Sequence, residues 1–344
     1  QRDCFPPMAD PRPASRLVAT AALVALFAAL ALFPLAAKAM GQPALVPLGA
    51  RILIYGIAAA SLNLALGFGG MVSFGHAAFF GLGGYVAAVM FQAAREETLA
   101  FGLFPGTEHL LVALGAAALL GGLLAAAIGA LSLRTAGVQF IMITLAFAQM
   151  VYFLFASLKA YGGDDGLTMR RRLALGSLDM RDDATLYYLA LAAATLVFLA
   201  LWRIVVSRFG RALDGVRQNE TRMQAMGVAP ARYKLAAFVM SGVGAALAGA
   251  LMANHMRFVS PDMLHWTKSG ELMIMVILGG VGTLLGPFLG ALALVGLETV
   301  LGGWTENWQL YLAPLLLGVV LFARGGLMGA LTRLVETRSI GRRT

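Results

Sequence analysis

Charged residues are scarce in this sequence: they make up 12% of its 344 residues, whereas 60% are hydrophobic. A soluble domain ordinarily contains about 25% charged residues, so a chain this apolar needs lipid around much of its surface. Apolar runs of about 20 residues recur along it, and each is long enough to cross a hydrocarbon core about 30 Å thick. The short alternating segments of a membrane β-barrel are not seen. The composition therefore predicts an all-α fold, a polytopic transmembrane helical bundle in a lipid bilayer.

Residues that carry out chemistry are also few. The one cysteine, Cys4, excludes an intrachain disulfide and a cysteine metal cluster, and the four histidines do not have the spacing of metal ligands. No HExxH motif, no GxSxG motif and no glycine-rich loop followed by Lys-Ser or Lys-Thr occurs. We therefore predict no catalytic residues, no metal and no cofactor. Any ATP hydrolysis that drives this protein takes place on a different polypeptide.

The net charge of +9 indicates orientation in the membrane rather than nucleic-acid binding. Most Lys and Arg residues lie near the two ends of the chain and in a central basic segment, which the positive-inside rule places in the cytoplasm. Both termini are therefore expected to be cytoplasmic, and no nucleic-acid partner is expected. A cluster in a loop expected outside departs from this rule: Arg170, Arg171, Arg172 and Arg181. A solvated loop is the simpler interpretation, and contact with an acidic docking protein is the alternative.

The apolar runs predict about ten membrane crossings, arranged as two similar halves. The expected crossings are 17–37, 50–67, 70–91, 109–133, 138–158, 185–206, 233–255, 270–285, 287–302 and 309–323. The halves are 17–206 and 233–323, with a cytoplasmic leader at 1–16, a coupling loop at 207–232 and a tail at 324–344. The run at 17–37 resembles a secretory signal, but its length favours an uncleaved helix. Glycines in 70–91 and 270–302 also allow half-helices or re-entrant turns.

The central basic segment, residues 207–238, predicts a short helix outside the membrane. Between 212 and 227 only Gly215 disfavours a helix. Arg217 lies three residues from both Asp214 and Glu220, a spacing that allows pairing on one helical face. Gly227 provides a C-terminal stop and Pro230 prevents simple continuation. From these features alone, a charged loop that only fixes topology is an equally good interpretation.

The same segment, GRALDGVRQNETRMQAMGVAPARYKLAAF, resembles the cytoplasmic coupling segment of LivM-type permeases of branched-chain amino acid ABC importers. The matching residues are Glu220, Ala225, Gly227, Tyr233, Lys234, Leu235, Ala237 and Phe238. Three further stretches match the same family in the same order: SLNLALGFGGMVSFGHAAFFGLGGYVAAV, SLKAYGGDDGLT and MVILGGVGTLLGPFLGA. The resemblance implies that a groove on an ATPase subunit receives this segment, with Arg217, Glu220, Ala225, Gly227, Tyr233 and Lys234 as the coupling residues.

The resemblance also implies an assembly and a location. Its partners would be a second permease subunit of the LivH type, two ABC ATPase subunits and a periplasmic or extracellular solute-binding protein, in the bacterial inner membrane. The implied solutes are branched-chain amino acids, with urea, amides or aromatic acids as alternatives within the family. An ion-gradient-driven secondary transporter is the alternative from another class. Such a transporter is expected to contain several ionisable residues within its spans, and this chain offers few.

Candidate pathway residues come from glycine clusters and from polar side chains within apolar spans. Each of two segments has a Gly pair followed three residues later by a hydroxyl residue, which indicates a weak internal repeat. Interrupted helices in corresponding halves often flank a transport pathway, although close helix packing explains glycines equally well. Polar residues such as Glu298 also need partners within the spans. The candidates are Asn63, Ser73, His76, Thr144, Gly279, Gly280 and Thr283, for which hydrogen bonding between or within helices is the competing interpretation.

Overall fold

The computed structural model describes residues 29–100, 104–176, 180–304, 310, 314, 318 and 325–329. It divides into two units, Gln1–Val46 and Pro47–Thr344. In the first unit the described part contains a short apolar helix, Ala29–Ala39. The expected leader lies outside the described residues, as do most of the expected crossings at 17–37 and 309–323 and most of the tail.

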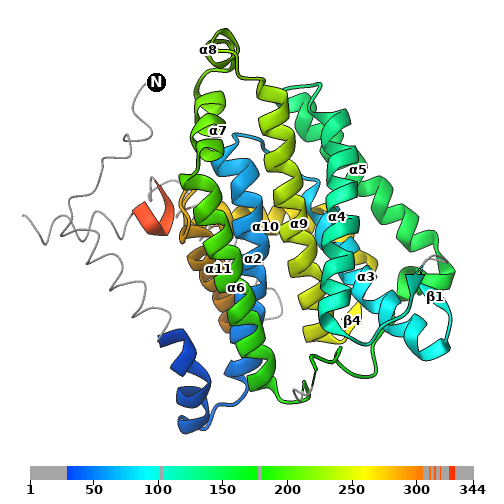
Figure 1. Ribbon diagram of the computed structural model, residues 1–344. Coiled ribbons are helices and arrows are strands. Elements are labelled where there is room, and N and C mark those ends of the chain that lie inside the picture. The colour runs from blue at the N-terminus through cyan, green and yellow to red at the C-terminus, as the bar shows by residue number, and fades with distance from the viewer. Residues whose placement is uncertain are drawn as a thin grey trace, which may run out of the picture. The chain divides into compact units, whose positions relative to one another are not determined.

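Long apolar helices dominate the second unit (Figure 1). Six helices among the described residues are long and apolar enough to cross a membrane, so the prediction of a transmembrane helical bundle is confirmed. They are α2 (Leu45–Asn63) continued by the π-helix η1 (Leu64–Phe68), α3 (His76–Glu96), α4 (Leu110–Ser132), α5 (Val138–Ser157), α6 (Asp183–Val206) and α9 (Pro230–Met256).

Shorter elements connect these helices. The helical ones are η2 (Lys159–Tyr161), η3 (Gly163–Asp165), α7 (Arg208–Gln218), α8 (Glu220–Ala225), η4 (Pro261–Leu264), α10 (Trp266–Gly279) and α11 (Gly286–Gly302). Four two-residue strands, which the sequence did not indicate, form two antiparallel pairs: β1 (Leu99–Ala100) with β2 (Phe104–Pro105), and β3 (Leu167–Thr168) with β4 (Phe258–Val259). The second pair joins the α5–α6 loop to the chain that leaves α9.

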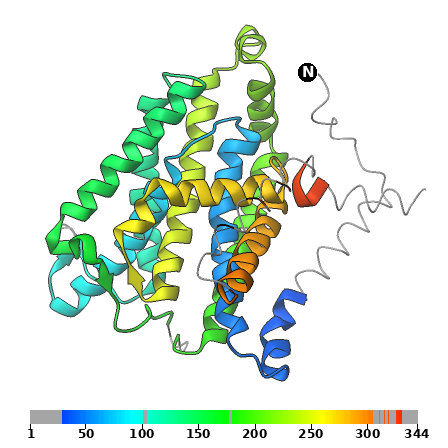
Figure 2. The same ribbon diagram turned by 180° about the vertical axis from the view of Figure 1, so that it is seen from behind.

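At two of the expected crossings, the structure is not helical where glycines occur. The segment 70–91 becomes helical only at His76, because Gly70 adopts a left-handed φ of +67°. Helix α10 has 14 residues and therefore spans about 21 Å, less than a hydrocarbon core of about 30 Å. Figure 2 shows α10 running across the long helices rather than along them. The expected crossing at 270–285 is thus a short transverse helix followed by a turn.

Helix α3 lies at the centre of the bundle and makes its most extensive contacts with α9. These helices approach closely because glycine lines their contact. A Cβ added at Gly83 would lie 1.9 Å from the carbonyl oxygen of Ala246, and one at Gly249 would lie 1.7 Å from that of Phe80. Small residues thus bring the two backbones together, as is common between membrane helices.

Helices α4, α5 and α6 present apolar side chains outward. Large hydrophobic residues exposed on them include Leu111, Leu119, Met142, Phe153 and Leu196. A face of this composition suits contact with lipid acyl chains, and it requires no protein partner. These three helices therefore each offer a face that suits lipid.

The tight contact between α3 and α9 predicts opposite effects for two glycine substitutions. We expect Gly83→Ala to lower the free energy of unfolding by about 1–3 kcal/mol, because the added methyl group overpacks a backbone contact. Gly115→Ala is the matched control, since no atom of another described segment lies within 4 Å of an added Cβ there. It should be neutral or stabilising by up to about 1 kcal/mol. Unfolding of the detergent-solubilised protein measures both, and equal stability of the two variants would contradict the close approach.

Candidate functional site

The predicted coupling segment forms two helices rather than one. Helix α7 begins at Ser207, whose hydroxyl accepts a hydrogen bond from the backbone N–H of Gly210, and it ends at Gln218. Asn219 is extended, and its side chain accepts a hydrogen bond from the backbone N–H of Arg222 at the start of α8. The expected single helix over 212–227 is therefore wrong, because an asparagine that caps the second helix interrupts the first.

The charges of this segment also pair differently from the prediction. Arg217 binds Asp214 at 2.8 Å, as its spacing indicated. Glu220 does not share that face and instead pairs with Lys234 at the start of α9. The Tyr233 ring stacks on that of Phe209, with 5.4 Å between ring centroids. Lys234 and Tyr233 thus tie the re-entering helix to α8 and α7 respectively.

The tip of this segment is open to solvent. Ala225, Met226 and Gly227 are all exposed. Gly227 adopts a left-handed φ of +83° and ends α8, donating a hydrogen bond to the Gln224 carbonyl oxygen. The coupling residues predicted from the sequence therefore comprise an exposed tip, Ala225 and Gly227, and residues that brace it against α7 and α9.

Arg217 connects α7 to the end of α2. Its Nη1 donates to the Gly67 carbonyl oxygen at 2.5 Å, and Gly67 lies in the π-helix η1. The aliphatic part of Arg217 covers Gly70, where an added Cβ would lie 2.9 Å from Cγ. A π-helix shifts the carbonyl groups out of the α-helical pattern, and Arg217 takes one of them as its partner. The coupling segment therefore contacts the place where the α2 helix becomes irregular.

Asn63 joins the same end of α2 to the turn between α10 and α11. Its Nδ2 donates to the Thr283 carbonyl oxygen at 2.7 Å, and its Oδ1 accepts from the Gly282 N–H at 3.0 Å. Gly280 and Gly282 have φ values of +124° and +77°, and the Thr283 hydroxyl donates to the Gly280 carbonyl oxygen at 2.7 Å. The structure thus brings Asn63, Gly279, Gly280 and Thr283 of the predicted pathway into one cluster.

The other predicted pathway residues lie elsewhere and have partners within the bundle. Ser73 accepts a hydrogen bond from the Gly75 N–H, and Thr144 donates to Ile141 of its own helix. His76 Nε2 lies 2.7 Å from Ser241 Oγ, which donates to the Ser61 carbonyl oxygen. Ser73, His76 and Thr144 are fully buried, so their observed contacts are with protein groups.

Several polar residues of the bundle had not been singled out from the sequence. Ser269 on α10 accepts from the Ala77 N–H and donates to the Phe74 carbonyl oxygen, and it thereby satisfies the start of α3. Arg51 on α2 binds Glu298 on α11 at 3.0 Å. An arginine and a glutamate that are each isolated within an apolar span were the signal for this second contact.

The outward arginine cluster is largely paired within the chain. Arg171 pairs with Glu108, and Arg172 binds Asp183 at the start of α6 at 2.6 Å. The hydrogen bond from Arg171, together with the charge of Arg95, holds the pKa of the Glu108 carboxyl group below its usual value. Arg171 and Arg172 therefore have acidic partners within the chain, and their presence does not require an acidic docking protein.

Comparisons with known proteins agree on one family. Residues 44–324 match the model of a family described as "Branched-chain amino acid transport system / permease component". The chain is 26% identical over 304 residues to the high-affinity branched-chain amino acid transport system permease protein LivM of Escherichia coli K12, covering 80% of this chain and 68% of the relative. The Salmonella typhimurium LT2 protein of the same name is 26% identical over 82% of this chain and 69% of its own length.

A second kind of relative matches a shorter stretch. The autoinducer 2 import system permease protein LsrC of Enterobacter sp. 638 is 35% identical over 159 residues, covering 42% of this chain and 44% of that protein. No solved structure matches the chain.

The cluster around Asn63 predicts a large cost for removing its amide group. We expect Asn63→Leu to lower the free energy of unfolding by about 1–3 kcal/mol, because the Gly282 N–H and the Thr283 carbonyl group lose their partner. Thr144→Val is the control, since it deletes a buried hydroxyl that binds only its own helix. The Asn63 variant should unfold at a clearly lower temperature than the Thr144 variant. Equal unfolding temperatures would count against the hydrogen bonds from Asn63 to the α10–α11 turn.

The ion pairs of Glu108 predict a pH-dependent contribution to stability. Because the folded-state pKa is lowered, the contribution is present above the unfolded pKa near 4.5 and is lost as the pH falls through the folded pKa. We therefore expect Glu108→Gln to melt below the wild type at pH 7, with the difference vanishing once the pH has fallen below the lowered folded-state pKa. A difference that is independent of pH would show that charge is not involved.

Proposed function

Because the chain belongs to the family of permease components of branched-chain amino acid transport systems, we propose that it is the membrane-spanning subunit of an ATP-driven importer of branched-chain amino acids. The LivM relatives are named as permeases for these solutes, which supports them over urea, amides or aromatic acids. The family also supports an ABC importer over an ion-gradient-driven transporter. The chain itself moves the solute and performs no hydrolysis.

The proposed assembly contains a second permease subunit of the LivH type, two ABC ATPase subunits and a solute-binding protein outside the membrane. Membership of an ABC importer family supports such partners. We place both termini and the α7–α8 segment in the cytoplasm, because the loop that carries these helices is rich in Arg and Lys. Crossings beyond the six long helices among the described residues, arranged in two similar halves, remain our proposal, and the transverse helix α10 is not counted among them.

One observation carries the mechanism: the contact between Arg217 and Gly67. Helix α7 contacts η1 through this hydrogen bond, and η1 in turn lies directly against the α10–α11 turn. A Cβ added at Gly67 would be 2.5 Å from the Gly282 nitrogen. A displacement of α7 therefore reaches Gly282 through two contacts.

The proposed cycle follows from this connection. An ATPase subunit receives the exposed tip of α8, and closure of the two ATPase subunits displaces α7 and α8 together. Arg217 transmits the displacement to η1, and the glycines at 280 and 282 allow the α10–α11 turn to change its backbone angles at low cost. Such a change at an interrupted helix would open the pathway to one side of the membrane and close it to the other.

The test uses the complete importer in proteoliposomes with ATP inside. We expect Arg217→Gln to lower solute uptake per ATP hydrolysed at least fivefold, because the shorter neutral side chain no longer links α7 to Gly67. Glu220→Arg with Gly227→Pro should abolish solute-stimulated ATP hydrolysis as well, because it alters the docking tip itself. Both variants should still insert into the membrane.

Arg203→Gln is the control, because Arg203 is an exposed arginine at the adjoining end of α6 and has no assigned role. It should retain uptake per ATP near that of the wild type. Wild-type coupling in the Arg217 variant would remove α7 from the mechanism, and ion-gradient-driven uptake by this chain alone would refute an ATP-driven importer.

A further inference from the structure

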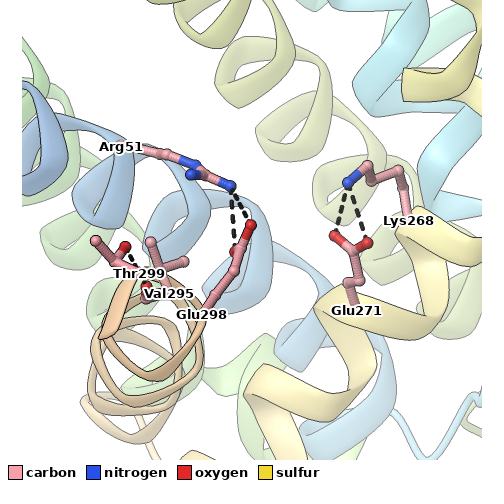
Figure 3. Close-up of polar contacts among 6 residues, drawn as sticks. All are labelled: Arg51, Lys268, Glu271, Val295, Glu298 and Thr299. Carbon is pink, nitrogen blue, oxygen red and sulfur yellow. Dashed lines mark hydrogen bonds and ion pairs between the residues drawn. The ribbon is translucent and has the colours of Figure 1, made fainter. Parts of the chain in front are cut away.

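Four ionisable side chains from three helices form two neighbouring ion pairs (Figure 3). Arg51 Nη2 on α2 binds both carboxylate oxygens of Glu298 on α11, at 3.0 and 3.2 Å. Lys268 Nζ binds both oxygens of Glu271, which lies one turn along α10, at 3.0 and 2.8 Å. Figure 3 shows Arg51 and Lys268 extending toward one another, each paired with its own glutamate, and Lys268 also interacts with the charge of Glu298. We call these four residues the charge cluster.

Close backbone contacts hold the helices that carry the charge cluster. A Cβ added at Gly279 would lie 1.8 Å from the Gly286 carbonyl oxygen, and one at Gly290 would lie 1.8 Å from that of Met275, so α10 and α11 touch directly. The Phe288 ring of α11 covers Gly56 of α2. The positions of the four charges relative to each other are thus fixed by packing, as a binding site requires.

The charge cluster does not suit contact with lipid. Its side chains are between 28% and 41% exposed, and a charge that faces hydrocarbon costs several kcal/mol. Helices α10 and α11 also expose hydrophobic residues, namely Ile274, Ile277, Leu292 and Val300, so only the charged groups themselves are unsuited to lipid. The four charged groups therefore need water or protein around them rather than acyl chains.

The groups of the charge cluster have unused binding capacity. A guanidinium group can engage a carboxylate with two parallel N–H groups, but Arg51 uses Nη2 alone for Glu298, and its buried Nε has no hydrogen-bond partner in the described part of the chain. Lys268 pairs with a residue of its own helix three positions away, which is a weak kind of ion pair. Lys268 can therefore exchange its partner for a new anion at low cost.

We propose that the charge cluster binds the zwitterionic head group of an α-amino acid during its passage. Arg51 and Lys268 would take the carboxylate, and Glu298 and Glu271 would take the ammonium group. The inference rests on the proposed function and names the site at which its solute is recognised. A neutral solute such as urea would not compensate either charge, and a carboxylic acid without an amino group would leave the glutamates with an excess of negative charge.

The location of the charge cluster fits a pathway that runs along α2. Arg51 and Asn63 are twelve residues apart in one helix, or about 18 Å at 1.5 Å per residue. Asn63 lies at the end of α2 that contacts α7 through η1, so the charge cluster lies toward the opposite end. A solute would meet the charge cluster first and the flexible α10–α11 turn afterwards.

The first measurement is uptake of labelled leucine by the complete importer in proteoliposomes, at saturating binding protein. We expect Glu271→Gln with Glu298→Gln to reduce uptake at least tenfold, while ATP hydrolysis stimulated by the binding protein stays within twofold of the wild type. Asp183→Asn is the matched control, because it neutralises the carboxylate of the Arg172 pair at the end of the bundle, and it should import normally.

A swapped variant, Arg51→Glu with Glu298→Arg, separates recognition from structure. It retains an ion pair between α2 and α11, but the negative charge now lies on α2 and the positive charge on α11. We expect uptake to remain lost, because the reversed charges would no longer match those on α10. Recovery of wild-type uptake would show that Arg51 and Glu298 only tether two helices, and it would overturn the site.

Carbodiimide labelling of the wild-type importer gives a readout that does not depend on any variant folding. We expect leucine to reduce labelling of Glu271 and Glu298 at least threefold, whereas urea and 4-methylpentanoate do not, and labelling of Glu108 stays constant. Equal labelling with and without leucine would refute the site even if leucine is imported. Failure of the wild type to import leucine with ATP would instead refute the proposed function.

Discussion

A peptide group inside a bilayer must find its hydrogen-bond partner within the protein, and this constraint explains the centre of the structure. Helix α2 becomes a π-helix at Leu64, and the chain between α10 and α11 is not helical. Hydrocarbon offers no partner for the backbone groups that are released there. Asn63 provides one donor and one acceptor to the α10–α11 turn, and Arg217 provides a donor to η1. The irregular segments are tolerated because the Asn63 and Arg217 side chains form hydrogen bonds with their free backbone groups.

The remaining architecture separates three kinds of helix face. Gly83 and Gly249 bring α3 and α9 into backbone contact and form the rigid centre. The outer faces of α4, α5 and α6 are apolar and suit lipid. The third kind bears Arg51, Lys268 and their glutamate partners on α2, α10 and α11. A membrane protein that only anchored itself would not need charges at this third face, so its composition points to contact with solute or with another subunit.

Residue patterns predicted the parts of the fold that depend on local chemistry. Apolar length gave the long helices, and the spacing of Asp214 and Arg217 gave their ion pair. The same reasoning placed Glu220 on the helix of Arg217, and it failed because Asn219 caps a new helix. A residue that favours a cap can also continue a helix when exposed, and the sequence alone does not choose between these conformations.

The sequence could not predict which distant segments contact each other, as the residues of the candidate pathway show. Asn63 was selected as a polar residue in an apolar span and Thr283 as the hydroxyl residue after a Gly pair, but their proximity depends on how α10 lies across the bundle. His76 was selected for the same reason and binds Ser241 instead. Arg51 was missed because a single charge in an apolar span needs a partner but does not identify it. Its role in joining α2 to α11 can be recognised only from the structure, which places Glu298 beside it.

The most direct test of the account follows the α10–α11 turn while ATP is turned over. Cys4 is the chain's one cysteine, so Thr283→Cys combined with Cys4→Ser leaves a single reactive thiol in this subunit. The account predicts that trapping the ATPase subunits with ATP changes the rate at which an impermeant thiol reagent labels this position, and that Arg217→Gln abolishes the change. An equal change in the presence and absence of Arg217 would contradict transmission of movement from α7 through η1 to the turn.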